Sequence, residues 1–595
     1  MKKALFFFAV ILSNTLFAQD LVILHTNDIH NHINGLAPET EYTPLVNDND
    51  PTLGGFSRLA GYFNSEKEKY GNKLLVVNAG DFSMGTLFQT LEADEGFQLN
   101  LMKRIGFEYV ALGNHEFDFG PNAFAKIVSN NQKLGAIPQL ICTNYQRASD
   151  RSDSDFVKKF DDGTILPYQI VEKNGYKIGI FSVLGKDAFA AIPGYIDVKF
   201  DKINNVAAKT SRYLKEKEKV DLVVALSHSG VQKNKKGEWI GEDVEMGKAA
   251  PDVDVIISGH THTLIPQLVK AGNAVVIQVE CYGYYVGKLD VTFDQNRKPQ
   301  FAYQMVPMND QIVADASIQQ YIDEKVANID KNLLNGLGVK FYDPVFETGF
   351  DLTMNDKKPE VSNLGPFVAD AISYYLNEKL QEGVDVVVVP TGTIRHDIDQ
   401  GKYGKQNIND VFNVMPLGMS EEKIPGSPLG KIYLTGRELK KVLELILGVY
   451  HKMSDYYLFY SGIQLTYNPD KGLFRKISEI KVGDDVKGYR TVSFSKKDKT
   501  LYSVAADKYT LSFIAKLKKM SFGVVNVVGK NRDGSVIQNN NFLIDSDKTK
   551  EGIQEAKEWL AILDYVRSFS DPNGNGLPEV PTVYQTKVNP AIVKK

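Results

Sequence analysis

The sequence predicts a two-domain α/β protein, and three observations support this fold class. The chain has 595 residues, more than the roughly 250–300 at which a single hydrophobic core stops growing, so at least two cores are expected. Short apolar runs alternate with helical stretches in the first half, which is typical of strands buried on both faces. A polar helical stretch then separates this half from a second α/β region.

The apolar runs of the first half are short enough to be strands. They lie at Leu21–Leu24, Leu74–Val77, Tyr109–Leu112, Ile178–Val183, Leu222–Leu226 and Val253–Ile257. Polar or glycine-rich segments bound each run, which favours one or more buried sheets covered by helices. These strands define a first domain over residues 19–309.

The second half is predicted to be a separate α/β domain. Residues 310–338 form a linker helix in this interpretation, with apolar residues at helical spacing, among them Ile318, Ile322, Val326 and Ile329. The second domain covers residues 339–595. Its clearest elements are a strand at Val384–Val389 and an amphipathic helix at Gly436–Val449. The two halves share no motif, and no internal repeat is visible.

The N-terminus has the layout of a secretory signal peptide. Lys2 and Lys3 precede an apolar run from Ala4 to Leu12, and the segment ends in Ala18, after which cleavage is expected. A membrane anchor is the alternative, but the apolar stretch is shorter than the roughly 20 residues that a transmembrane helix requires. The mature chain is therefore expected to be exported to the periplasm, the cell surface or the medium, with no integral membrane span.

The composition excludes several other classes of protein. With 43% hydrophobic and 24% charged residues, the chain resembles ordinary globular proteins. A formal net charge of −4 and the lack of a long Lys/Arg run disfavour polymeric nucleic acid as a partner. The two cysteines, Cys142 and Cys281, can form one disulfide or remain buried thiols, and they exclude a Cys-rich zinc site. The oligomeric state is left open.

Residues that can bind a metal follow five of the six predicted strands. They are Asp28 and His30, then Asp81, then Asn114, His115 and Asp118, then His228, and finally His260 and His262. In open α/β sheets the ligand site lies beyond the carboxyl ends of the strands, so these residues are expected to converge. Five of the nine histidines belong to this set. The other four, His25, His32, His396 and His451, are expected to be structural.

The residue types in this set suit a pair of divalent metal ions. Carboxylates, neutral imidazoles and an Asn carbonyl are donors that favour Zn, Mn or similar ions, and a carboxylate with two oxygens can bridge two of them. Asp81 is the expected bridge. Two ions roughly 3.5–4 Å apart activate water and stabilise both the attacking and the leaving oxygen in phosphoryl transfer. The glycines beside Asp81, Asn114 and His260 would let the backbone approach the ions closely.

The ordered blocks resemble a known signature. Asp28-x-His30, Gly80-Asp81, Gly113-Asn114-His115-Glu116, His228 and Gly259-His260-x-His262 resemble the calcineurin-like metallophosphoesterases. The extension to Phe117-Asp118 and the two-domain length narrow the resemblance to the 5′-nucleotidase and UDP-sugar hydrolase family, whose members are typically secreted or periplasmic. It implies an N-terminal metallophosphoesterase domain and a C-terminal 5′-nucleotidase-type substrate-binding domain.

The resemblance also implies roles for the individual residues. One metal would be held by Asp28, His30, Asp81 and His262, and the second by Asp81, Asn114, His228 and His260. His115 would be the catalytic histidine, which donates a hydrogen bond to the transferring phosphoryl group, and Asp118 would orient it. A purely supporting role for His115 is the alternative.

The second domain resembles the family's substrate-binding domain less closely. Gly392-Thr393-Ile394-Arg395 resembles a loop that supplies an arginine to the substrate, and a guanidinium can bind phosphate oxygens bidentately. A surface salt bridge is the alternative for Arg395. Leu417 stands where the family commonly has a phenylalanine that stacks on the nucleobase. No clear second stacking aromatic is present, although Tyr509, Phe513 or Phe522 could replace it instead of being core residues.

The leading hypothesis is therefore a secreted 5′-nucleotidase-like phosphohydrolase whose substrate is a small nucleotide. A UDP-sugar or cyclic-nucleotide phosphodiesterase using the same site is an alternative. A hypothesis of another class is a catalytically silent surface protein that binds nucleosides or other ligands, but intact Asp81, Asn114 and His115 argue against it.

In the C-terminal tail, residues 571–576 resemble half of a calcium loop, yet Thr582 replaces the expected glutamate, which favours a simple turn.

Overall fold

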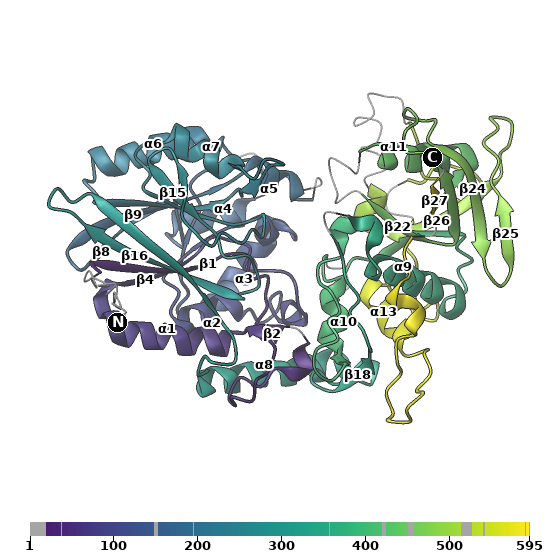
Figure 1. The fold of residues 1–595 in the computed structure, drawn as a ribbon, viewed down its shortest axis with the longest axis horizontal. Helices are drawn as coiled ribbons and strands as arrows, with labels where there is room; N and C mark the ends of the chain where they lie inside the picture. Colours follow the sequence, from purple (N-terminus) through teal and green to yellow (C-terminus); the bar gives the residue numbers. More distant parts are fainter. Residues whose placement is uncertain are drawn as a thin grey trace, which may run out of the picture.

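The computed structural model describes residues 19–36, 38–147, 153–193, 196–355, 358–418, 424–449, 457–512, 526–538, 542–589 and 591–593. The predicted signal peptide, together with His451, Phe513 and Phe522, lies outside the described residues. Of the helices in the described part of the chain, none combines the length and the apolar character needed to cross a membrane. Figure 1 shows two bodies side by side, the first half of the chain on the left and the second half on the right.

The first body contains two sheets, and all six predicted strands are present in them. The seven-stranded sheet has the order β17 (Pro299–Pro307), β16 (Tyr285–Phe293), β1 (Leu21–Thr26), β4 (Leu74–Asn78), β5 (Tyr109–Ala111), β6 (Gln139–Ile141) and β7 (Ile165–Leu166). The six-stranded sheet has the order β14 (Val269–Ala271), β15 (Ala274–Ile277), β13 (Val255–Ser258), β10 (Leu222–His228), β9 (Tyr176–Leu184) and β8 (Tyr168–Lys173).

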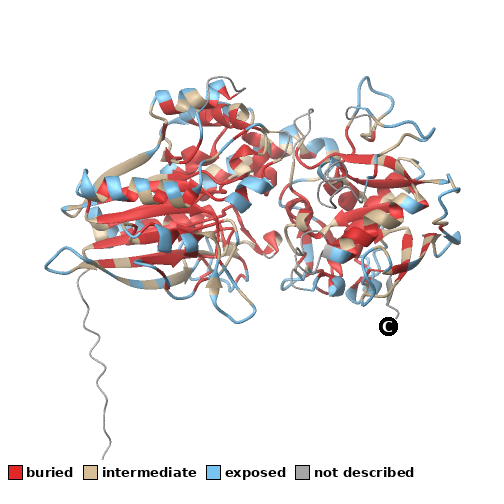
Figure 2. Cartoon of the chain, turned by 90° about the horizontal axis from the view of Figure 1, so that it is seen from above, coloured by how far each residue is buried: buried red, intermediate tan, exposed pale blue. Residues whose placement is uncertain are grey.

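The two sheets pack face to face, as alternation along single strands shows. In β1, Leu21 and Ile23 belong to a buried cluster with Leu222 and Val224 of β10, whereas Val22 and Leu24 point to the opposite face. Because successive side chains of a strand point to opposite faces, one face of each sheet contacts the other sheet and one contacts helices. In Figure 2 the strands of the left-hand body are red along much of their length, so successive residues are buried.

Helices cover the two outer faces. The seven-stranded sheet is covered by α1 (Phe56–Tyr70), α2 (Gln98–Ile105) and α3 (Pro121–Leu134), with α4 (Ser154–Asp161) beside α3. The six-stranded sheet is covered by α6 (Ile203–Glu216) and α7 (Glu242–Ala249). The architecture is thus helix, sheet, sheet, helix. The sequence predicted buried strands but did not distinguish a covering helix from a covering sheet, because either one gives a continuous apolar run.

The second body is built on two smaller sheets. One has the order β21 (Leu429–Thr435), β26 (Leu501–Asp507), β19 (Val386–Pro390) and β22 (Leu458–Ser461), and the other β25 (Gly488–Thr491), β24 (Ile477–Asp484), β23 (Ile463–Tyr467) and β27 (Ala591–Val593). Four α-helices of this half are α9 (Leu364–Tyr374), α10 (Ile408–Val414), α11 (Gly436–Val449) and α13 (Glu558–Val566). The predicted strand corresponds to β19, and α11 has the predicted bounds.

Helix α8 (Ala316–Asn332) lies between the two halves in the sequence. The Asp315 carboxylate caps it by accepting hydrogen bonds from the N–H groups of Ser317 and Ile318. Its apolar residues Ile322 and Val326 are buried, and the helix packs against α1. The helix therefore adds to the core of the first body as well as joining it to the second.

The two bodies contact each other through buried polar groups. The Glu39 N–H donates to Asp410 Oδ1 at 3.0 Å, and its carboxylate accepts hydrogen bonds from the side chains of Asn34 and Asn409. The Leu87 N–H donates to Asn409 Oδ1 at 3.0 Å. Buried polar groups need such partners, so these bonds stabilise the relative orientation that the two bodies have in this structure.

Glu39 makes this contact sensitive to pH. Burial, and next the charge of Asp410, raises the pKa of Glu39 from 4.5 to about 8. The folded protein therefore binds more protons than the unfolded chain between about pH 4.5 and 8, and the free energy of unfolding falls as the pH rises through this window. We expect the melting temperature of Glu39→Gln to depend less on pH than that of the wild type between about pH 5 and 8. The exposed control Glu68→Gln should follow the wild type, and a Glu39→Gln variant that also follows it would contradict this account.

Candidate metal centre

Five strand ends meet at one edge of the first body and bring the predicted metal-binding residues together. Strands β1, β4 and β5 of the seven-stranded sheet lead to Asp28, Asp81 and Asn114. Strand β10 of the six-stranded sheet ends at His228, and β13 leads to His260 and His262. The site therefore spans the ends of both sheets, which is why its residues are so far apart in the sequence.

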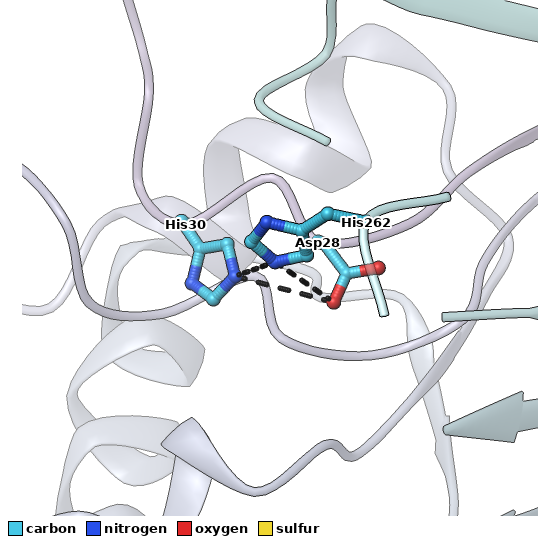
Figure 3. A group of neighbouring side chains, drawn as sticks. All are labelled: Asp28, His30 and His262. Carbon is cyan, nitrogen blue, oxygen red and sulfur yellow. Dashed lines mark hydrogen bonds and ion pairs between the residues drawn. The ribbon is translucent and has the colours of Figure 1, made fainter. Parts of the chain in front are cut away.

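The first cluster consists of Asp28, His30 and His262 (Figure 3). The two imidazoles face each other with their Nε2 atoms 3.0 Å apart, and Asp28 Oδ1 lies 3.6 Å from His262 Nε2 and 4.0 Å from His30 Nε2. His30 Nδ1 is 3.2 Å from the Met84 carbonyl, which can only accept, so Nδ1 carries the proton and Nε2 presents a lone pair. Donor atoms this close, all facing one point, fit a shared cation.

The second cluster consists of Asp81, His228 and His260. His228 is fully buried, and its Nδ1 donates to the Ala79 carbonyl at 3.0 Å, which leaves Nε2 facing Asp81 Oδ2 at 2.9 Å. Asp81 Oδ2 also lies 3.9 Å from His30 Nε2 in the first cluster. Asp81 therefore stands between the two clusters, in the place that a bridging carboxylate would occupy.

Asn114 supplies an independent test of whether the residues fit a metal. Its side chain is 1% exposed, and its Oδ1 atom has no hydrogen-bond partner among the described residues. An amide oxygen buried without a partner costs free energy comparable to a lost hydrogen bond, so such an atom calls for another ligand. A divalent cation at the second cluster would satisfy it.

The backbone around these clusters is held in an uncommon conformation. Five of the seven predicted metal ligands have positive φ angles, namely Asp28 (49°), His30 (50°), Asp81 (49°), His260 (75°) and His262 (47°). Such angles are infrequent for residues other than glycine and gather at functional sites, where the surrounding structure enforces them. Close packing at Gly113 is part of this enforcement, because a Cβ there would lie 2.1 Å from Asp81 Oδ1.

Burial keeps most of the ligand imidazoles neutral. It is the largest cause that lowers the pKa of His30, His260 and His262, and it brings the pKa of His260 to about 3. Neutral imidazole is the form that binds metals. His228 differs, because the Asp81 carboxylate outweighs the effect of burial and raises its pKa to about 10. A cation bound between these two groups would take the place of that proton.

His115 and Asp118 form a pair beside the clusters. His115 Nδ1 lies 2.7 Å from Asp118 Oδ2, and the His115 ring is 5.1 Å from the His30 ring. Burial lowers the pKa of His115, but the charges of Asp118 and Asp81 outweigh it and raise the pKa to about 9. The imidazole is thus held as a hydrogen-bond donor whose Nε2 is not used by Asp118. The backbone N–H of His115 also donates to Asp81 Oδ1 at 2.9 Å, which connects this pair to the clusters.

Two buried carboxyl groups, for which the sequence predicted no role, hold this framework. Glu116 accepts hydrogen bonds from the N–H groups of Asp81, Ser83 and Gly113, at 3.0, 2.9 and 2.6 Å. Asp243 accepts from Ser227 and Ser258, which precede His228 and Gly259. Glu116 belongs to the Gly-Asn-His-Glu block, so its place in that block was the available signal. Asp243 lies on α7, and no local pattern indicates its role.

The predicted substrate residues lie on the second body. Gly392 is in a 3₁₀ turn at Thr391–Thr393, and Arg395 follows it; both are half-buried. The charge of Arg395 is, after burial, the largest cause that lowers the pKa of His262, so this guanidinium acts electrostatically on a predicted metal ligand. Leu417 is half-buried beside Pro416, whose carbonyl accepts a hydrogen bond from Gln89 of the first body. Tyr509 is 38% exposed.

Three further predictions from the sequence concern the cysteines, the C-terminal tail and the remaining histidines. Cys142 and Cys281 are both free, buried thiols. In the tail, the Asp571 carboxylate accepts hydrogen bonds from the N–H groups of Gly574, Asn575 and Gly576, which is the geometry of a closed turn. His25 is buried next to Tyr303. The ring centroids of His32 and His396 are 6.3 Å apart, at the contact between the two bodies.

Each half of the chain matches a known protein family. The calcineurin-like phosphoesterase family matches residues 21–264, and the 5′-nucleotidase C-terminal domain matches residues 340–513. The 5′-nucleotidase of Rattus norvegicus is 25% identical over 488 residues, which are 78% of each chain. The trifunctional nucleotide phosphoesterase protein YfkN of Bacillus subtilis is 24% identical over 489 residues, 78% of this chain but only 30% of that longer protein.

A solved structure has the same overall fold. The 5′-nucleotidase precursor from Thermus thermophilus superimposes with a TM-score of 0.65 at 20% sequence identity. The superposition covers 97% of this chain and 100% of that one. The likeness in fold therefore extends over both bodies.

Proposed function

Since the chain belongs to the 5′-nucleotidase family of calcineurin-like phosphoesterases, which are metal-dependent phosphoester hydrolases, we propose that it is an exported enzyme that releases phosphate from nucleotides. The observation that carries this proposal is the convergence of the two clusters on Asp81, with the buried Asn114 oxygen left for a cation. Two divalent ions, Zn, Mn or similar, are the proposed cofactors.

Each metal has a proposed ligand set. Asp28, His30, Asp81 and His262 would hold the first, and Asp81, Asn114, His228 and His260 the second. When bound, the two ions supply Lewis acidity and lower the pKa of water, which provides a nucleophile at neutral pH. Asp81 would belong to both sets, and Glu116 holds the Asp81 backbone by accepting a hydrogen bond from its N–H group.

His115 is the proposed catalytic residue. Its Nδ1 is hydrogen-bonded to Asp118, so its Nε2–H is free to donate to a phosphoryl oxygen as negative charge develops. Asp118 fixes the ring and favours its protonated form. This arrangement stabilises the transition state more than the ground state, which is the requirement for a faster reaction.

Arg395 is the proposed contact to the substrate phosphate or its neighbourhood. The ion pairs that arginines form among the described residues are those of Arg58, Arg297 and Arg490, so Arg395 has no carboxylate partner there. An unpaired guanidinium near a cation-binding site suits an anionic ligand, which it can bind bidentately. Gly392 and Leu417 are proposed to line the remainder of the substrate site.

The chain has a proposed order of domains. A signal peptide at residues 1–18 would be followed by the catalytic domain at 19–309, the linker helix at 310–338 and the substrate-binding domain at 339–595.

A rotation of the second domain would carry the substrate to the metals. A covalent crosslink between the two domains should then lower turnover.

A substrate panel tests the proposed activity. With Mn²⁺ added, the purified mature chain should release phosphate from AMP faster than it cleaves UDP-glucose or 2′,3′-cyclic AMP. Arg395→Ala should raise the KM for AMP about 10- to 100-fold, since it removes a charge-assisted bidentate contact. The exposed Arg532→Ala is the matched control. Cleavage of UDP-glucose or 2′,3′-cyclic AMP without release of phosphate from AMP would favour the phosphodiesterase alternative. No turnover of any substrate would favour a silent binding protein.

A further inference from the structure

Tyr282 connects the metal centre to the second body. Its backbone N–H donates to the Asp28 carbonyl at 2.7 Å, and its hydroxyl donates to the Arg395 carbonyl at 3.0 Å. Its ring lies against His30 and His262, with centroid distances of 5.8 and 5.6 Å. One residue therefore contacts a predicted metal ligand at one end and the predicted substrate arginine at the other.

The conformation of Tyr282 is enforced by its surroundings. The residue is 9% exposed and has a φ of 57°, in the left-handed region that a bulky residue rarely adopts. His32 and His396 enclose the ring, with centroid distances of 4.2 and 5.9 Å. Strain at a buried residue beside a reactive centre indicates that its orientation matters there.

Tyr284 provides a second contact of the same kind. His396 Nδ1 lies 2.6 Å from the Asp397 carbonyl, which can only accept, so Nδ1 carries a proton. The Tyr284 hydroxyl forms a hydrogen bond with Nε2 of the same ring at 3.2 Å. Two nearby tyrosines of the first body thus bind two adjacent residues of the second.

These contacts fix the backbone of Arg395, while its side chain has no hydrogen bond or ion pair with the other residues that the structure describes. Its N–H donates to the Val414 carbonyl at 2.9 Å, and its carbonyl accepts from Tyr282. Both polar groups of its backbone are therefore occupied. A fixed backbone lowers the cost of binding, because only the side chain of Arg395 has still to be ordered when the ligand binds.

We propose that Tyr282 is a positioning residue that sets Arg395 relative to the metal centre through the hydrogen bond from its hydroxyl to the Arg395 carbonyl. This inference rests on the proposed function, in which Arg395 meets the phosphate of the substrate. Tyr282 itself does not contact the substrate. Its effect is transmitted through Arg395 alone, so it disappears when the guanidinium is absent.

Tyr282→Phe tests the proposal, because it removes the hydroxyl and keeps the ring. We expect kcat/KM for AMP to fall about 3- to 10-fold, mainly through KM, as for the loss of one hydrogen bond. The affinity for Mn²⁺, measured by calorimetry, should stay within about twofold of the wild type, since the ring contacts with His30 and His262 remain. Tyr303→Phe, which loses a hydroxyl 3.3 Å from His25 elsewhere in the first body, is the matched control.

A double-mutant cycle separates positioning from a merely structural role. In an Arg395→Ala background, adding Tyr282→Phe should change kcat/KM less than about twofold, because the two residues act as a unit. Full additivity of the two substitutions would overturn the proposal. So would a loss of Mn²⁺ affinity parallel to the loss of turnover, since this would place the effect at the metal ligands.

Binding of inorganic phosphate to the Mn²⁺-loaded protein makes the test independent of the proposed activity. If the wild type binds phosphate without hydrolysing AMP, the proposed function fails, yet Tyr282→Phe should still weaken phosphate binding about 3- to 10-fold, and only when Arg395 is present. An unchanged phosphate affinity in Tyr282→Phe would overturn the positioning role whether or not AMP is a substrate.

Discussion

Asp81→Ala should abolish both metal binding and turnover. Asp81 lies between the two clusters, 2.9 Å from His228 Nε2 and 3.9 Å from His30 Nε2, so its removal leaves both clusters without their common carboxylate. We expect kcat/KM to fall by at least about 10³-fold, because several kcal/mol of transition-state stabilisation depend on the ions. Phosphate release from AMP and metal content by mass spectrometry measure the two effects.

The control for Asp81→Ala is Asp161→Ala, an exposed carboxylate on α4. It should keep the wild-type metal content and activity. Asp81→Ala is also expected to keep the fold, because the N–H groups of Ser83 and Gly113 donate to the Glu116 carboxylate without the Asp81 side chain. A soluble, folded Asp81→Ala protein that retains two bound metals and substantial activity would contradict a bridging role.

His115→Asn should separate catalysis from metal binding. If His115 donates a hydrogen bond to the transferring phosphoryl group, its loss should lower kcat about 10²- to 10³-fold, as for the loss of one preorganised donor. Metal content and Mn²⁺ affinity should stay close to those of the wild type. Asp118→Asn should have a smaller effect in the same direction, because it weakens the orientation of the ring without removing the donor.

A role for His115 as a metal ligand would give a different result. His115, His30 and Asp81 also form a group with ligand atoms close enough to hold one ion. If His115 is a ligand, His115→Asn should lower Mn²⁺ affinity in parallel with kcat. Loss of metal together with loss of turnover would therefore refute the role of His115 as a catalytic donor.

The residues of the candidate metal centre could be located in the sequence because their signal is local. Each of its ligands follows an apolar run by a few residues, and the types Asp, His and Asn restrict the chemistry of the site. The prediction of Arg395 as a substrate contact also came from a local signal, the Gly-x-x-Arg loop. For the base-stacking residues the local signal was weak, since Leu417 replaces the family's aromatic and Tyr509 is partly exposed.

The sequence by itself determined the α/β class, the two halves, the six strands of the first half and the residues that can hold metals, because strand periodicity and motif spacing involve only near neighbours. Only the tertiary structure decided that two sheets face each other, that Glu39 meets Asp410 across 371 residues, and that Tyr282 reaches Arg395 across 113. The physical reason is that a strand's apolar pattern is the same under a helix or a second sheet. A buried carboxyl or hydroxyl, likewise, acquires its role from the partner that the fold brings to it.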